Sequence, residues 1–193
     1  MKRDWKKHTS TIIFVAFVLV ILFVPAAKAK LIQGLMEIGL FKPDLAEDKK
    51  VINADLSAIK FKDAKGNILS LADLKGKIVF LNFWATWCPP CLAEMPSINK
   101  FYEQYKNDEE VVFLMIDADS DFPKAQAYLN RKSYKFKVYT FASNIPKNIF
   151  SGSLPTTIVF DKKGRIAMNG VGAANYASKE FLTFIKKLKD LKD

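Results

Sequence analysis

The stretch FWATWCPPC, residues 83–91, contains both cysteines of this 193-residue chain. It follows a nearly continuous apolar run, IVFLNF at 78–83, and such runs are typical of a strand covered on both faces. After it, apolar residues recur at helical spacing from Cys91 to Tyr105. The sequence therefore predicts that Cys88 and Cys91 lie where a buried strand ends and a helix begins.

The predicted helix start favours ionisation of the Cys88 thiol. Unpaired backbone N–H groups and the helix dipole stabilise negative charge there, and they can lower a thiol pKa to roughly 3.5–7.5. We expect Cys88 to be the more exposed, attacking thiol and Cys91, one turn deeper, to be the resolving thiol. Pro89 and Pro90 suit the first helical turn because they pre-set φ and lack N–H groups that would stay unpaired. A C-x-x-C pair in this setting indicates reversible thiol–disulfide exchange.

Other uses of the cysteine pair fit the sequence less well. A structural disulfide across so short a loop constrains the unfolded chain little, and small domains that rely on disulfides often have several. A structural zinc site usually needs four ligands, and the only histidine, His8, precedes the apolar N-terminal segment. The remaining possibility for zinc is a site shared across a dimer. A copper carrier that uses a cysteine pair plus a histidine is disfavoured, because no histidine accompanies the cysteines. We expect no metal, and no cofactor beyond the redox-active Cys88–Cys91 disulfide.

The net charge of +10 does not indicate a nucleic-acid partner. Residues 1–30 carry six basic residues and one acidic residue, and the remainder carries 24 and 19, so each part contributes +5. The excess in the longer part is scattered and mostly lysine, which is typical of a solvated surface.

The first 53 residues differ in composition from the rest. Residues 1–10 are basic and polar, 11–27 are apolar, and 28–53 combine an apolar segment with a charged linker. The apolar part is near the lower length limit for a membrane-spanning helix. Its basic start predicts a retained anchor with the N-terminus in the cytoplasm, although Ala27-Lys28-Ala29 loosely matches a signal-peptide cleavage site. Both interpretations place the following domain outside the cytoplasm, facing the periplasm or the cell exterior.

A second apolar pattern, from Leu31 to Phe41, follows directly. It suits a helix that lies on the outer face of the membrane, and it also suits a helix that folds back on the domain. A freshly cleaved N-terminus rarely needs such a segment, so the pattern favours the anchor. The polar residues 42–51 are interpreted as a linker.

From residue 54 to 193 the patterns predict one α/β domain. A turn at Gly66-Asn67 indicates a β-hairpin at its start. Strands are then expected at 78–83, 111–117, 155–161 and 166–171, and helices at 91–105, 122–132 and 178–192. A central mixed sheet with helices on both faces satisfies this order.

The motifs resemble those of the thioredoxin superfamily, and more closely its membrane-tethered, extracytoplasmic TlpA/ResA-like branch. The resemblance is carried by FWATWCPPC followed by LAEMP, and by SLPTTIVFD about sixty positions later. It covers residue 55 to the C-terminus and implies the thioredoxin fold, with Cys88 attacking the substrate and Cys91 resolving the mixed disulfide. It also implies that Pro155 follows a cis peptide bond and packs against the disulfide. The backbone of Leu154 could then pair with an extended substrate peptide; an ordinary trans proline at the start of an edge strand is the alternative.

The resemblance gives roles to further residues. Glu94 matches an acidic residue that could exchange a proton with Cys91, unless it is an exposed first-turn glutamate that favours the helix dipole. Cytoplasmic thioredoxin has a buried aspartate where this chain has Asn82, and asparagine cannot take a proton. Trp87 is expected in the substrate platform, which also includes Pro89, Pro90, Leu154 and Pro155, whereas Trp84 could equally be a packing residue.

These observations predict a thioredoxin-like enzyme, a tethered disulfide reductase. Its expected partners are disulfide-bearing protein substrates, apocytochrome c among them by resemblance, and a membrane protein that supplies electrons. We expect a monomer in the cytoplasmic (inner) membrane. A disulfide oxidant or isomerase would use the same chemistry in another direction. A thiol peroxidase or a module that only binds partners is the alternative from another class.

Overall fold

The computed structural model describes residues 4–41, 43 and 56–191. Two helices come first, α1 (Asp4–Phe23) and α2 (Pro25–Glu37). The domain begins with a β-hairpin of β1 (Lys60–Asp63) and β2 (Ile68–Ser70). A short 3-10 helix lies on each side of it, η1 (Leu56–Ala58) before and η2 (Leu71–Leu74) after. It continues with β3 (Ile78–Trp84), α3 (Pro89–Tyr105), β4 (Val111–Asp117), α4 (Phe122–Lys132), β5 (Val138–Phe141), β6 (Thr156–Phe160), β7 (Ile166–Val171) and α5 (Lys179–Asp190).

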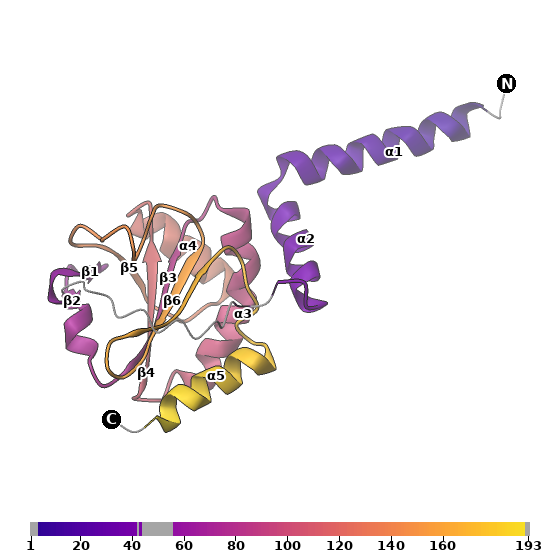
Figure 1. Ribbon diagram of the computed structural model, residues 1–193. Helices are drawn as coiled ribbons and strands as arrows, with labels where there is room; N and C mark the ends of the chain where they lie inside the picture. The colour runs from indigo at the N-terminus through magenta and orange to yellow at the C-terminus, as the bar shows by residue number, and fades with distance from the viewer. Residues whose placement is uncertain (1–3, 42, 44–55, 192–193) are drawn as a thin grey trace.

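A seven-stranded mixed sheet in the order β2-β1-β5-β4-β3-β6-β7 forms the centre of the domain (Figure 1). The strands β3, β4 and β5 run parallel, and the other neighbours are antiparallel. All seven residues of β3 are buried, as the apolar run at 78–83 predicts for a central strand. The predicted α/β domain with an opening hairpin is therefore confirmed.

The two faces of the sheet are covered differently. Successive residues of a strand point to opposite faces, so Phe80 and Leu81 of β3 enter separate apolar clusters. Phe80 packs with residues of α3, α4 and α5, whereas Leu81 packs with η1, η2 and the loop residues Ile149 and Phe150. The expected helical cover on both faces thus takes an uneven form, with the three α-helices of the domain on one face and 3-10 helices on the other.

One strand, β5, was not predicted. Its four residues alternate between buried and partly buried, which is a strand pattern, but they follow the lysine-rich stretch 135–137. Phe141 at its end pairs with Phe61 of β1, and Val138 pairs with Met115 of β4. The strand therefore joins the opening hairpin to the rest of the sheet.

The N-terminal helices meet at a sharp bend. The helix α1 ends at Phe23, Pro25 begins α2, and the two axes differ by 91°. Among the residues that the structure describes, no single helix is long and apolar enough to cross a membrane, but the bent pair could do so by length and composition. Figure 1 shows α1 extending away from the domain and α2 lying beside α3. The segment that begins at Leu31 thus folds back on the domain, and the predicted linker lies outside the described residues except Pro43.

Candidate active site

Both cysteines lie at the start of α3, directly after the loop that leaves β3. Cys88 is the N-cap residue, and its sulfur accepts a hydrogen bond from the backbone N–H of Cys91 at 3.3 Å. Pro89 and Pro90 occupy the first helical positions, where their missing N–H groups leave no hydrogen bond unmade. The predicted position of the Cys88 sulfur at a helix N-terminus is confirmed.

The two sulfurs are joined in a disulfide, and the Cα atoms of Cys88 and Cys91 are 5.3 Å apart. Cys88 is 3% exposed and Cys91 0%, so the expected order of exposure holds by a small margin only. Both belong to the apolar cluster between the sheet and its three α-helices. Cys88 is therefore less accessible than its position at a helix start predicts. Its exposed neighbours are Trp87, which is 57% exposed, and the partly exposed Pro89 and Pro90.

The peptide bond between Leu154 and Pro155 is cis, as the resemblance implied. Pro155 is buried and Leu154 partly buried. The antiparallel register of β3 and β6 sets Thr156 opposite Phe83, so Pro155 lies next to the end of β3 from which the cysteine loop starts. The carbonyl of Pro155 accepts the N–H of Gly172, and this bond ties the loop to the end of β7.

Glu94 lies inside the domain rather than on its surface. It is 0% exposed, so the alternative of an exposed first-turn glutamate is wrong. Its carboxyl accepts hydrogen bonds from Asn82 Nδ2 at 2.7 Å and from the N–H of Ala174 at 3.3 Å. Burial raises the pKa of Glu94 to about 8, although both hydrogen bonds act in the opposite direction. The group is consequently mostly protonated at neutral pH.

A buried polar network extends from Glu94 to the sheet. Asn82 shares the α3 face of β3 with Phe80, and it also donates to Thr157 Oγ1 on β6 at 2.8 Å. The fully buried Tyr176 hydroxyl shares a hydrogen bond with the Thr157 side chain. Sequence reasoning missed Thr157 and Tyr176, and the one available signal was a polar Asn82 inside an otherwise apolar strand.

The two tryptophans of the motif have different environments. The indole N–H of Trp87 donates to Asp119 Oδ1 at 2.9 Å, which holds an exposed ring beside the cysteines. Asp119 lies in the turn after β4. This turn is held by the Asp117 carboxylate, which accepts hydrogen bonds from the backbone N–H groups of Asp119 and Asp121. Trp84 is fully buried against Tyr128 and is a packing residue. Sequence reasoning also missed Asp119, because its partner Trp87, in the loop between β3 and α3, is 32 positions away along the chain.

The comparisons with known proteins agree with this geometry. The Redoxin family model matches residues 46–183. The thiol-disulfide oxidoreductase ResA of Bacillus thuringiensis (strain Al Hakam) is 33% identical over 144 residues, which cover 74% of this chain and 83% of ResA. The chain belongs to the ResA-like thiol-disulfide oxidoreductases of the thioredoxin superfamily.

One further relative in sequence and one solved structure are also similar to this chain. ResA of Halalkalibacterium halodurans is 31% identical over 150 residues, or 76% of this chain and 85% of that protein. The crystal structure of a DsbF homologue from Corynebacterium diphtheriae superimposes with a TM-score of 0.55 at 25% identity, and it covers 72% of this chain and 88% of that structure. The fold of this ResA-like enzyme is thus thioredoxin-like, and α1 and α2 lie before the part that matches the family.

The two cysteine sulfurs of this ResA-like enzyme are joined in a disulfide, and the buried Glu94 carboxyl lies three residues after Cys91 in α3. Within residues 4–41, 43 and 56–191, no three His, Cys, Asp or Glu side chains form a group that could hold a metal ion. The cysteine pair can exchange two electrons with another dithiol or disulfide.

Proposed function

We propose that this enzyme is an extracytoplasmic, membrane-tethered reductase of protein disulfides that works through Cys88-Pro-Pro-Cys91. The observation that carries the proposal is the Cys88 sulfur at the N-cap of α3, where it accepts the N–H of Cys91. The same N–H and the helix dipole stabilise a thiolate at this position in the reduced enzyme.

The reaction begins when the Cys88 thiolate attacks one sulfur of a substrate disulfide. A bond forms between Cys88 and that sulfur, and the other substrate sulfur leaves as a thiolate. Cys91 then loses its proton and attacks the Cys88 sulfur, which restores the Cys88–Cys91 disulfide and releases the second substrate sulfur as a thiolate. The substrate has gained two electrons and takes up two protons, and the enzyme has lost two electrons.

Glu94 accepts the proton of Cys91 in this scheme. Burial raises its pKa from 4.5 to about 8, so the minority of Glu94 carboxyls that are ionised at neutral pH are stronger bases than an ordinary glutamate and can take a thiol proton. Its burial at the centre of the polar network keeps the carboxyl from equilibrating freely with solvent.

The substrate surface is formed by the groups around the disulfide. Trp87, Pro89 and Pro90 border Cys88, and the backbone of Leu154 beside Pro155 offers hydrogen bonds to an extended peptide. Substrates are proteins that carry a disulfide, and apocytochrome c is a candidate.

Retention in the membrane by the apolar segment of residues 11–27, most of which lies in α1, is part of the proposal. From Thr9 to Phe23 most of the large apolar side chains of α1 are exposed, as with Ile13 at 65% and Phe23 at 76%, and only Val18 and Ile21 are partly buried. A helix that is apolar all round is stable only when it is buried in protein or lipid. The anchor would hold the domain near a membrane protein that returns two electrons to the disulfide; a cleaved signal peptide is the alternative.

The experiment compares Cys88→Ala and Cys91→Ala with the wild type. Cys88→Ala is expected to abolish insulin-disulfide reduction, and Cys91→Ala is expected to accumulate mixed disulfides with envelope proteins in intact cells. The redox state of the wild-type pair in those cells gives the direction: a mostly reduced pair indicates a reductase. Failure of Cys91→Ala to trap any envelope protein would refute the mechanism.

A further inference from the structure

We propose that α2 is a positioning element of the redox centre: by packing on the start of α3 and on residues 173–175, it holds the Ala174 N–H on the Glu94 carboxyl. The inference deepens the proposed function, since it concerns the group to which we assign proton transfer. It goes beyond the family match, because α2 precedes residue 46.

One face of α2 is apolar and is covered by the domain. Ala29 and Met36 are 8% and 3% exposed, and they form a cluster with Ala93, which is 2% exposed. Ile32 lies on the same face, because residues 29, 32 and 36 are spaced by three and four positions. Leu31 points away and is 50% exposed. The packing is thus directional and specific to one side of the helix.

The domain side of this contact is the immediate surroundings of Glu94. Ala93 and the partly buried Leu92 are the residues between Cys91 and Glu94 in α3. The third partner, Ala173, precedes the residue whose N–H binds Glu94 Oε2. Displacement of α2 would therefore uncover both segments that enclose the carboxyl.

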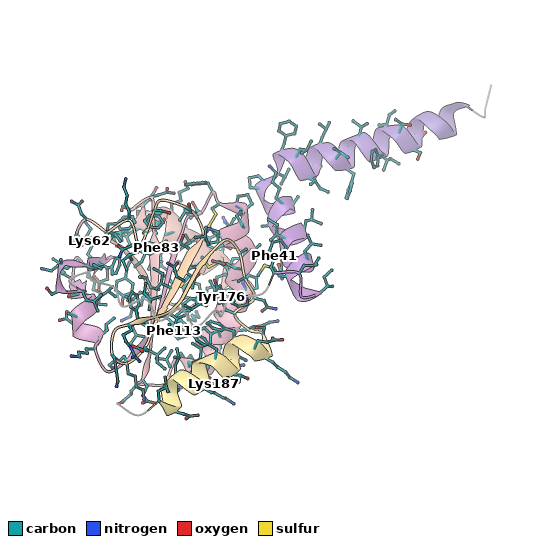
Figure 2. The ribbon with its side chains drawn as sticks, viewed as in Figure 1. Phe41, Lys62, Phe83, Phe113, Tyr176 and Lys187 are labelled. Carbon is teal, nitrogen blue, oxygen red and sulfur yellow. A yellow bond between two sulfur atoms is a disulfide. The ribbon has the colours of Figure 1, made fainter. Side chains whose placement is uncertain are left out.

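A backbone hydrogen bond makes the connection tighter. The segment after α2 turns at Gly39, which has φ +86°, and the carbonyl of Phe41 then accepts the N–H of Asn175 at 3.2 Å. Phe41 and Tyr176, the residue after Asn175, are labelled in Figure 2. The next N–H, that of Tyr176, donates to Ser97 Oγ on α3. Residues 174–176 are thus held in turn by Glu94, by Phe41 in the segment after α2, and by Ser97 of α3.

Among the residues that the structure describes, the groups in contact with the Glu94 carboxyl carry no charge at neutral pH in the oxidised enzyme. Its hydrogen-bond partners are the neutral Asn82 and a backbone N–H, the pKa of the buried Tyr176 lies well above its ordinary value, and both cysteines are in the disulfide. Of the charged side chains on α2, Lys30 and Glu37 are exposed and Lys28 partly so, and none of them hydrogen-bonds the Glu94 carboxyl. A change in the Glu94 titration therefore reports its burial.

The experiment introduces a charge on the face of α2 that packs against the domain and compares it with the same charge on the exposed face of α2. Met36→Asp and the control Leu31→Asp are made in the full chain, oxidised, in detergent micelles. Two quantities are measured by NMR: the exchange rate of the Ala174 amide and the titration midpoint of the Glu94 carboxyl carbon. Met36→Leu serves as the conservative variant, and Met36→Ala replaces Met36→Asp if circular dichroism shows that the latter is unfolded.

In Met36→Asp, or in Met36→Ala if it is used instead, we expect the Ala174 amide to exchange at least about ten-fold faster. The Glu94 midpoint should fall from about 8, because hydration removes the main cause of the raised pKa and outweighs the repulsion from a new carboxylate at position 36. Leu31→Asp and Met36→Leu should behave as the wild type. Equal results for Met36→Asp and Leu31→Asp, whether both change or neither does, would overturn the inference. The proposed proton transfer by Glu94 is tested separately. If Glu94→Gln reduces insulin at the wild-type rate, the proton-transfer role is refuted, and the result for α2 is not affected.

Discussion

Replacement of Glu94 by glutamine should change how the stability of this enzyme depends on pH. The native carboxyl has a pKa of about 8, whereas its ordinary value is 4.5. Between these values the native state holds a proton that the unfolded state has lost, so the free energy of unfolding falls as pH rises. The loss is about 1.4 kcal/mol per pH unit, or about 5 kcal/mol by the time pH exceeds the native pKa.

Glutamine is neutral throughout and has no such loss. Its amide N–H₂ must face either Asn82 Nδ2 or the Ala174 N–H, both of which are donors, so we expect a pH-independent cost of about 1–3 kcal/mol. The variant should therefore be less stable than the wild type near pH 5, and it should equal or exceed the wild-type stability by pH 8.

Denaturant unfolding of the oxidised protein, followed by tryptophan fluorescence from pH 5 to 9, measures both curves. The disulfide keeps the cysteines from titrating. Glu103→Gln on the exposed side of α3 is the matched control, and it removes only a surface ion pair with Lys106, worth less than about 1 kcal/mol. If the curves of Glu94→Gln and the wild type run parallel over this range, the native carboxyl is ionised in its ordinary range and the burial argument is wrong.

Three further substitutions test other contacts. Asp119→Ala removes the hydrogen bond that holds the exposed Trp87 indole, so kcat/KM for insulin should fall about three- to ten-fold while Tm stays within 2 °C or so; an unchanged kcat/KM would show that the ring needs no fixed orientation. Phe101→Ala removes a fully buried ring from the cluster between the sheet and the helices, and the free energy of unfolding should drop by about 3–5 kcal/mol; a loss below about 1 kcal/mol would mean that the site repacks. Asn82→Asp places a second carboxyl against Glu94, so stability should decrease by about 3 kcal/mol or more at pH 8, and less at pH 5, where one proton can be shared; equal losses at both pH values would contradict this.

Local patterns in the sequence determined the redox pair and most of the elements, β5 excepted. The strand at 78–83 could be predicted because a central strand is apolar on both faces, and Cys88 at a helix start because two prolines and helical spacing follow it. The Ser178 cap of α5 likewise depends only on neighbours, since its side chain accepts the N–H of Phe181. Each of these features leaves a signal within a few residues along the chain, although the strand itself is completed by hydrogen bonds to β4 and β6.

Tertiary structure alone decided the environment of the site. Glu94 meets Asn82 across 12 positions and Ala174 across 80, and no periodicity encodes which polar groups meet at such separations. The deep burial of Cys88 and the docking of α2 on α3 have the same origin. They depend on which apolar surfaces are left uncovered once the sheet and its helices have packed, and that is a property of the assembled domain.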